Sequence, residues 1–546
     1  MRRVALQLFA ALCILTAGSL LADGQAYKVT NLVSDGSVPA VTMDANFLNP
    51  WGISVSGTWW ISTADTGFNY VIPSATDTIS FKVIVPAASG STTATGTPAG
   101  SVTTTGASGM LLSNGTKASF LFSTLDGTIS GWNSKLGTNN AVALIAINNS
   151  AAGASYPGLA ILNVDATTSY IIAPNFGAGA AIEVYDQNFK AAKLAGSFTD
   201  PNLPSGYAPF SVHILNNQVW VAYAPHKTTA PYDEIQGPGN GVVSVFDNAG
   251  NFVARAVTGG NLNAPWGVAF APKSFGIFSG DLLIGNLGDG MINVYDPKTY
   301  AFLGQLMDST GKPLTYPSLW DLLTGGTAIG NSTSVGGGDT STVYFTAGLV
   351  DEKHGLLGAI ANTTVTGAAP AFGFSASTHG ATVAAGNSVQ ATLAVAPANG
   401  FNGTVSFACA GLPAGAACSF SPSSLTVNAS APATSQLTIT TTQSTMTALR
   451  QRYQSGRHTV IFALAALLPF TFLGWIRPRR RRDLAAILGP LAVLVVSLGT
   501  GAFLVGCGND SKPAVTTTPA GLSSVVVTAT ASTGASQQTT VAMTVK

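Results

Sequence analysis

Charged residues are scarce in this sequence of 546 residues. Only 9% of the residues are charged, against about 25% in an ordinary soluble domain, and the formal net charge is +1. A chain with so little net charge and 46% hydrophobic residues does not have the composition of a disordered protein. It also lacks the excess of basic residues with which nucleic-acid-binding proteins hold phosphates. The composition therefore argues against a disordered chain and against a nucleic-acid partner.

Common catalytic and metal-binding motifs are missing as well. The sequence contains no Gly-x-Ser-x-Gly, no His-Glu-x-x-His and no phosphate-binding loop. Its five histidines are scattered along the chain, and no Cys/His spacing is typical of a zinc site. These absences favour a binding protein over an enzyme.

Residues 1–26 have the three regions of a secretory signal peptide. Arg2 and Arg3 precede an apolar run over residues 4–21, and small residues follow it. A polar, strand-like segment begins at Tyr27, which favours a cleaved signal peptide over an N-terminal membrane anchor. We therefore expect the rest of the chain to be exported.

Two further apolar runs, residues 459–476 and 484–506, carry no charge. As helices they would be about 27 and 34 Å long, close to the ~30 Å hydrocarbon core of a bilayer. By the positive-inside rule, the arginine-rich turn at 477–483 lies in the cytoplasm and both flanks lie outside. The pattern predicts a two-helix transmembrane hairpin rather than two buried core helices. Its topology is set by Arg477, Arg479, Arg480, Arg481 and Arg482.

The cysteines fall into separate groups. Cys507 ends the sequence LVGC, which resembles a bacterial lipoprotein signal and makes this residue a candidate for lipidation. Such signals are normally N-terminal, so an unmodified cysteine at a helix end is the preferred interpretation. Cys409 and Cys418 lie nine residues apart in a segment expected to be exported, where oxidation is permitted. They are predicted to form a disulfide.

A repeat of about 50 residues occupies residues 27–364. Its landmark is Asn-Pro-Trp-Gly at 49–52, which returns as Ala-Pro-Trp-Gly at 264–267. Each unit resembles four short antiparallel strands, so that six units predict a six-bladed β-propeller rather than an array of β-sandwiches. The last unit is short, and the strand at 27–32 is expected to complete it. Weaker copies of the landmark contain Pro157, Pro209 and Pro317.

The motifs at residues 49–52, 262–267, 285–290, 345–348 and 351–355 resemble those of an uncharacterised family of exported bacterial proteins that is similar to NHL-type six-bladed propellers. The resemblance covers residues 27–362 and implies a propeller fold in the bacterial cell envelope. It implies no activity and no catalytic residues.

From residue 368 the composition shifts to Ala, Thr, Ser and Gly, with short alternating segments at the spacing of a β-sandwich. Residues 400–407 and 411–415 resemble a bacterial immunoglobulin-like module. The usual last two strands of that module occur only after the apolar runs. We therefore expect residues 368–445 and 513–546 to form one sandwich with the hairpin inserted in it. A disordered Thr/Ser linker is the alternative for residues 513–546.

Candidate site residues come from the predicted propeller, because ligands of propellers lie at the mouth of the central channel. Asp65, Asn175, His226 and Asn286 occupy similar places in different units. Oxygen ligands from several units could hold Ca²⁺, and such a site would resemble that of lactone-hydrolysing six-bladed propellers. The preferred interpretation is that these residues cap turns. Residues 351–354 (Asp-Glu-Lys-His) could form a general acid/base cluster, but a solvated loop is preferred there.

The sequence as a whole predicts an all-β fold: a six-bladed β-propeller and an immunoglobulin-like β-sandwich, joined to a two-helix transmembrane hairpin. The predicted function is a binding or scaffolding module of the bacterial cell envelope, held in the membrane with its other domains on the periplasmic or extracellular side. The partner would be an envelope protein, a glycan or a small molecule. The alternative function is a Ca²⁺-assisted hydrolase or lyase with its site at the channel mouth.

Overall fold

The computed structural model describes residues 24–73, 77–88, 95–326, 337–365, 370–398, 400–443 and 517–546. Within these ranges every long element is a strand, and the only helical segments are three short 3₁₀ turns. The 3₁₀ turns are η1 (Ser134–Leu136), η2 (Ser150–Ala152) and η3 (Gly276–Phe278). The fold is all-β.

The predicted transmembrane hairpin has to be corrected. No helix in the described part of the chain is long and apolar enough to cross a membrane. Both apolar runs, the turn at 477–483 with its five arginines, Cys507 and residues 1–23 of the predicted signal peptide lie outside the described residues. An integral hairpin and a membrane partner are therefore not supported.

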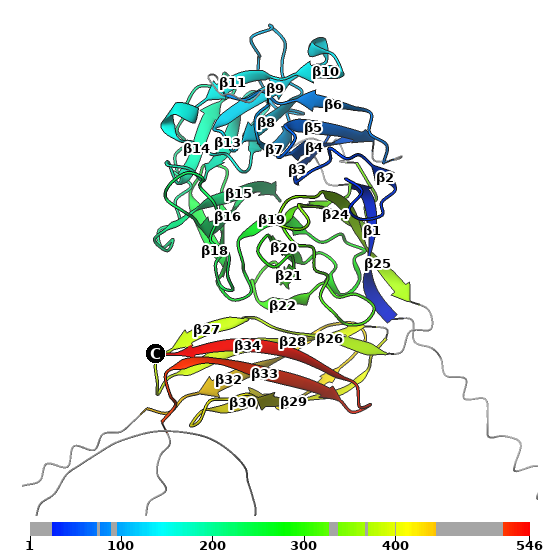
Figure 1. The fold of residues 1–546 in the computed structure, drawn as a ribbon, viewed down its shortest axis with the longest axis vertical. Coiled ribbons are helices and arrows are strands. Elements are labelled where there is room, and N and C mark those ends of the chain that lie inside the picture. Colours follow the sequence, from blue (N-terminus) through cyan, green and yellow to red (C-terminus); the bar gives the residue numbers. More distant parts are fainter. Residues whose placement is uncertain are drawn as a thin grey trace, which may run out of the picture. The chain divides into compact units, whose positions relative to one another are not determined.

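Six sheets follow one another along the first part of the chain (Figure 1). The sequence repeat predicts four strands in each unit, but the third sheet has only three. Its fourth strand is missing because the segment after β14 pairs with it at a single bridge, between residues 185 and 191. The first three sheets contain β3 (Pro50–Val55), β4 (Thr58–Thr63), β5 (Phe68–Pro73), β6 (Phe81–Ile84) and β10 (Asn139–Val142); then β7 (Pro98–Thr103), β8 (Phe120–Thr124), β9 (Thr128–Trp132) and β11 (Leu144–Asn148); then β12 (Ala160–Asn163), β13 (Ser169–Asn175) and β14 (Ala181–Asp186).

The last three sheets have four, four and five strands, and two strands of the last one, β1 and β2, come from the beginning of the chain. They contain β15 (Tyr207–Leu215), β16 (Gln218–Pro225), β17 (Val242–Phe246) and β18 (Phe252–Thr258); then β19 (Pro265–Phe270), β20 (Leu282–Asn286), β21 (Ile292–Tyr295) and β22 (Phe302–Gln305); then β23 (Leu319–Thr324), β24 (Thr342–Ala347), β25 (Leu356–Val365), β1 (Gly24–Ser34) and β2 (Thr42–Met43).

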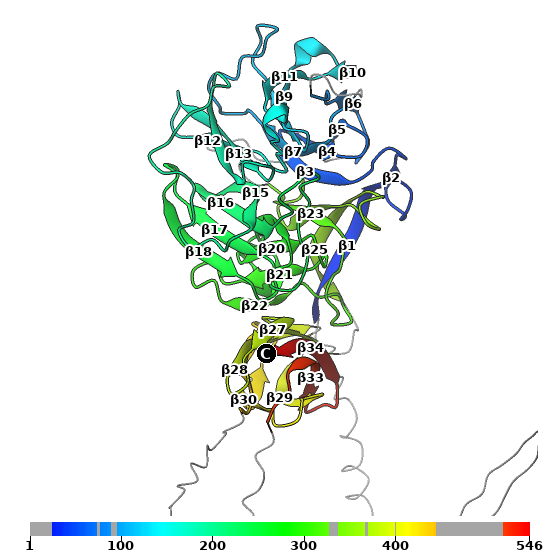
Figure 2. The ribbon, with the colours of Figure 1, turned by 60° about the vertical axis from the view of Figure 1, so that its left-hand side comes forward.

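These sheets form a closed, propeller-like ring (Figure 2). The first strand of each repeat (β3, β7, β12, β15, β19 and β23) is an edge strand of its sheet and contacts the corresponding strand of the next sheet, and β23 contacts β3 in turn. Each pair of neighbouring sheets encloses its own hydrophobic cluster. Burying apolar surface stabilises a fold by roughly 25 cal/mol per Å². This stabilisation is therefore distributed around the whole ring.

Pairing of β1 with β25 closes the ring. The two strands run antiparallel from Gly24↔Val365 to Ser34↔Leu356, and β1 begins three residues before the strand start that the sequence predicts. Tyr27 on β1 is buried, and its hydroxyl donates a hydrogen bond of 2.8 Å to the carbonyl oxygen of Phe275, in the fifth sheet's connection. The beginning of the chain thus ties the sixth sheet to the fifth.

The repeated Pro-Trp-Gly landmark lies at the beginning of β3 and β19. Its tryptophan is directed to the middle of the ring, where Trp51 and Trp266 are almost fully buried. Its glycine lies where the next inner strand passes closely: a Cβ at Gly52 would stand 2.9 Å from the carbonyl oxygen of Ala99. A larger residue would push the first two sheets apart, so the motif serves the closure of the ring.

A two-sheet sandwich follows the ring, and its strands come from both sides of residues 444–516. The disulfide between Cys409 and Cys418 joins its two sheets. Residues 521–545 form strands that pair with the earlier segment, which excludes a linker there. One sheet contains β26 (Ala371–Ala376), β28 (Ser388–Ala398), β32 (Ala433–Thr440) and β30 (Ala417–Ser421); the other contains β27 (Gly380–Val383), β34 (Ser536–Val545), β33 (Gly521–Ala531), β29 (Gly403–Ala410) and β31 (Ser424–Val427).

Replacing the buried tyrosine of the closing strand tests its importance. Tyr27→Ala removes an aromatic ring that lies 4.7 Å from the ring of Phe275, together with its hydrogen bond. We expect the free energy of unfolding to fall by about 3–5 kcal/mol, as for other buried aromatic residues replaced by alanine. Lys28→Ala, at the exposed neighbouring position, should change it by less than about 0.5 kcal/mol. Equal effects of the two variants in urea denaturation would contradict this role of β1.

Candidate functional site

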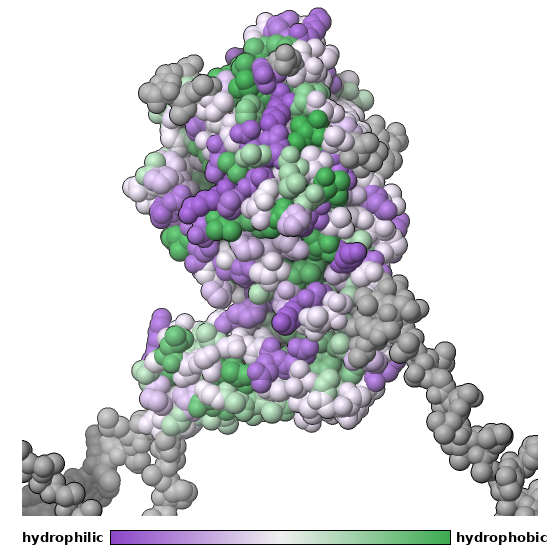
Figure 3. Space-filling view, turned by 45° about the vertical axis from the view of Figure 1, so that its right-hand side comes forward, coloured by the Kyte–Doolittle hydropathy of each residue, from purple (hydrophilic) through white to green (hydrophobic). Residues whose placement is uncertain are grey.

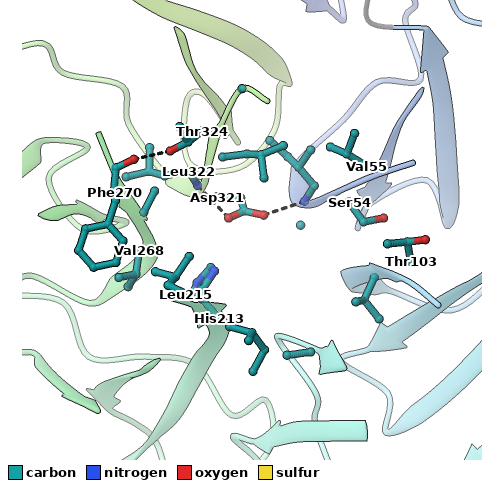
Figure 4. Close-up of a pocket in the computed structure, with 18 of the residues that line it drawn as sticks. Ser54, Val55, Thr103, His213, Leu215, Val268, Phe270, Asp321, Leu322 and Thr324 are labelled. Carbon is teal, nitrogen blue, oxygen red and sulfur yellow. Dashed lines mark hydrogen bonds between the residues drawn. The ribbon is translucent and has the colours of Figure 1, made fainter. Parts of the chain in front are cut away.

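A cavity of about 740 Å³ lies between the inner strands of the ring. Every one of the six sheets contributes to its wall, so the cavity occupies the central channel of the ring (Figure 4). The lining residues are 52–55, 100–103, 105, 159–161, 163, 212–217, 266, 268–274, 321–326 and 340.

One end of the channel is closed by aromatic side chains. Trp51 stacks on Trp320 with ring centroids 3.4 Å apart, and Trp266 meets Trp51 edge-on at 6.4 Å. All three lie at the beginning of their inner strands, and Phe210 of β15 joins the same cluster. The exposed lining residues, including Lys273, belong to the loops that follow the inner strands. The cavity therefore has an aromatic floor and opens at the other end.

Asp321 is the only carboxylate in the described lining of the cavity. Its Oδ2 accepts the backbone N–H of Ile53 from the neighbouring sheet at 2.8 Å, and its Oδ1 accepts that of Leu322 at 2.8 Å (Figure 4). No cation in the described part of the chain lies within ion-pair distance of it. Burial raises the pKa of this carboxyl to about 7, although the two N–H donors act in the opposite direction.

His213 of β15 lines the same cavity. Its Nε2 lies 3.0 Å from the carbonyl oxygen of Trp266. A carbonyl oxygen can only accept, so Nε2 carries the proton and Nδ1 is left as an acceptor. Burial lowers the pKa of the imidazole to about 4, which keeps it neutral at pH 7. The imidazole therefore offers an acceptor without adding charge.

The rest of the wall is mainly apolar with interspersed hydroxyls (Figure 4). The hydroxyls of Ser54 and Ser101 bond to each other at 2.8 Å, and that of Thr324 donates to the carbonyl oxygen of Phe270. Lys273, the one lysine in the described lining, is exposed at the rim. A ligand in the interior would meet an apolar wall with a few fixed polar groups.

The four residues predicted from the sequence do not line this cavity. They lie at or just after the ends of the second strands β4, β13, β16 and β20, beside residues of the aromatic floor. Asn175 accepts the N–H groups of Ser155 and Gly177 at 3.1 and 2.9 Å and donates to Glu183 at 2.7 Å. It therefore satisfies local turns.

Asn286 and His226 differ in their surroundings. The amide of Asn286 donates to the carbonyl oxygen of Asn261 at 2.7 Å and to the carboxylate of Asp289 at 3.1 Å. Neither ring nitrogen of His226 has a hydrogen-bond partner in the described structure, and its ring meets that of Phe176 edge-on at 5.1 Å. Burial lowers the pKa of His226. It packs as a neutral aromatic side chain.

Asp65 belongs to a carboxylate pair bridged by an amide. Asn49 donates from Nδ2 to Asp65 at 3.3 Å and to Glu352 at 3.0 Å, while its Oδ1 accepts the indole N–H of Trp320 at 2.9 Å. Burial, reinforced by the negative charges of Glu234 and Asp65, raises the pKa of Glu352 to about 7. Burial also raises the pKa of Asp65.

The predicted cluster at 351–354 does not come together. Glu352 faces Asn49, whereas His354 bonds to Asp35 of the segment after β1, with Nδ1 2.6 Å from Oδ2. Asp351 is exposed. In the part of the chain that the structure describes, no three His, Cys, Asp or Glu side chains are placed to hold a metal ion.

Sequence reasoning missed Asp321 and His213. Register shows that Asp321 occupies the position that Gly52 and Gly267 occupy in the first and fifth sheets, because Leu319, Pro50 and Pro265 pair alike with the second strand. Aligning the sixth repeat on its tryptophan, Leu-Trp-Asp against Pro-Trp-Gly, would have revealed a carboxylate in place of a glycine. The sequence carries no comparable signal for His213.

No protein-family model matches the chain. Three uncharacterised proteins of Acanthamoeba polyphaga mimivirus are similar to it. The first is 28% identical over 350 residues, which cover 62% of this chain and 81% of that protein. The other two are 31% and 30% identical and are matched over 47% and 33% of their own lengths, from 34% and 33% of this chain.

Solved structures resemble the chain more distantly. Hydrazine synthase of Kuenenia stuttgartiensis is 13% identical, with a TM-score of 0.34, over 55% of this chain and 74% of that one. The PQQ-bound aldose sugar dehydrogenase of Streptomyces coelicolor is 11% identical, with a TM-score of 0.35, over 61% and 98%. Scores this low carry no functional argument.

These comparisons correct the resemblance stated above. The similar proteins are viral, so membership in an exported bacterial propeller family is not supported. Together with the absence of a membrane-spanning helix from the described residues, they leave the predicted location in a bacterial membrane without support.

The raised pKa of Glu352 predicts a pH-dependent stability. Between about pH 4.5 and 7 the folded protein holds a proton here that the unfolded chain has released, so this residue lowers stability as pH rises through that window. In Glu352→Gln the stability difference from the wild type should therefore grow in favour of the variant from pH 5 to pH 8. The neighbouring Asp351→Asn, at an exposed position, should show no such trend in urea denaturation. A constant difference for Glu352→Gln would contradict the burial of its charge.

Proposed function

We propose that the protein is a binding module that takes a small ligand into the open channel of its six-sheet ring. The carrying observation is the cavity of about 740 Å³ with a closed aromatic floor and an exposed rim. Ligand sites in proteins are typically concave, of about 300–1,000 Å³, and mostly apolar with a few placed polar groups. The channel has these properties.

The polar groups in the channel are held rigidly by the main chain, which suits binding. Asp321 accepts two backbone N–H groups, and His213 donates to a backbone carbonyl. Rigid partners lose little conformational freedom when a ligand is bound. The outer face shown in Figure 3 mixes hydrophilic and hydrophobic residues, whereas the channel gathers apolar side chains around these two groups.

Filling the channel should abolish binding. Leu215 lines the cavity and is half-buried, so Leu215→Trp places an indole in the space that a ligand would occupy. We expect fragments that bind the wild-type protein in ligand-observed NMR to lose at least tenfold in affinity for this variant. The matched control is Leu111→Trp, because Leu111 is 62% exposed and lies outside the cavity. A screen in which no fragment distinguishes the two variants would contradict a channel site.

A further inference from the structure

The described lining of the channel contains one carboxylate, and no cation among the described residues pairs with it. The other titratable groups in its described lining are His213, whose imidazole is neutral at pH 7, and Lys273, which is exposed at the rim. Asp321 is 6% exposed. Its carboxylate therefore sits inside an apolar cavity where, among the described residues, only backbone N–H groups offset its charge.

Burying such a charge is costly, and a bound cation would reduce the cost. A carboxylate that has lost most of its water keeps its charge at a free-energy penalty unless an opposite charge or enough donors replace the water. Each oxygen of Asp321 receives one donor from the protein, which leaves further acceptor capacity on both. Nδ1 of His213 adds a second acceptor to the same cavity.

The position of Asp321 in the repeat also needs an explanation. Glycine suffices at the matching places in the first and fifth sheets, Gly52 and Gly267, where the inner strands make the same irregular pairing. A carboxylate is therefore not required to form an inner strand of this ring. Its presence in the sixth sheet gives the channel a negative charge that the matching positions do not provide.

We infer that the ligand of the channel is a small organic cation, with an ammonium group that pairs with Asp321 and an apolar body that packs on the channel wall. The inference rests on the proposed function. The ammonium supplies the N–H donors and the positive charge that the carboxylate lacks, and apolar residues such as Val55, Leu215 and Val268 would surround the remainder (Figure 4).

Three probes of the same shape test this inference in calorimetric titrations of the full-length protein: benzylammonium, benzyl alcohol and benzoate. At pH 8 benzylammonium should bind at least tenfold more tightly than the other two. Its affinity should fall about tenfold from pH 8 to pH 6, because a carboxyl with a pKa near 7 loses most of its charge over that interval. The affinity for benzyl alcohol should not change.

Two variants separate the channel carboxylate from overall charge. Asp321→Gly, which introduces the residue of the matching positions, should abolish the preference for benzylammonium over benzyl alcohol. Asp281→Asn removes one negative charge outside the cavity lining and should keep the preference. If Asp321→Gly does not fold, the wild-type comparison of pH 6 with pH 8 decides alone.

The inference is overturned if benzylammonium does not bind measurably, if it binds no better than the alcohol, if its affinity is the same at both pH values, or if Asp321→Gly retains the preference. In each of these cases fragments that Leu215→Trp excludes would still show that the channel binds ligands of another class. Absence of any such fragment would instead remove the proposed function itself.

Discussion

The ring depends on one pairing, that of the first strand with the last sheet. Without β1, the strand β25 would be an exposed edge, and the sixth sheet would lose Tyr27, one of its contacts to the fifth. The inner strands line a cavity only while they remain in a circle, because each of them is an edge strand whose free side faces the channel. The cavity therefore exists only when the ring is closed. A change that opens the seam between β1 and β25 should weaken ligand binding without touching the cavity.

The two ends of the channel differ because of the repeated landmark. Tryptophans from three sheets meet at the beginning of the inner strands and exclude solvent there, and the glycine that follows lets neighbouring strands approach. The sixth sheet keeps its tryptophan but replaces the glycine with Asp321, which follows the floor residue Trp320 in β23 and lines the cavity. The same departure from the repeat thus joins two sheets through the N–H of Ile53 and places a charge in the cavity.

Much of the ring could be predicted from the sequence, because the repeat depends on local rules. The spacing of the Pro-Trp-Gly landmark and the strand periodicity gave six units, and the short last unit indicated that residues 27–32 would complete it, as β1 does.

The site could not be found in this way. Asp65, Asn175, His226 and Asn286 share a place in the repeat, but that place is beside the closed end. There Asn175 and Asn286 bond to neighbouring backbone and side-chain groups, and His226 packs as a neutral aromatic side chain. Which end of a channel is open depends on how side chains from separate sheets pack, and His213 and Asp321 meet the same cavity only after that packing is formed. The predicted hairpin rested on hydropathy and on the arginines between the two apolar runs, and no helix of the described structure corresponds to it.

The central claim is that ligands enter the channel and reach Asp321 instead of binding beside the strand ends near Asn49. A crystal structure of the protein soaked with benzylammonium tests it most directly. The account predicts ordered density for the probe inside the ring, with its nitrogen at hydrogen-bond distance from the carboxylate of Asp321 and its ring against the channel wall. Density for the probe only at the closed end, next to Asp65 and Glu352, with water alone in the channel, would contradict it.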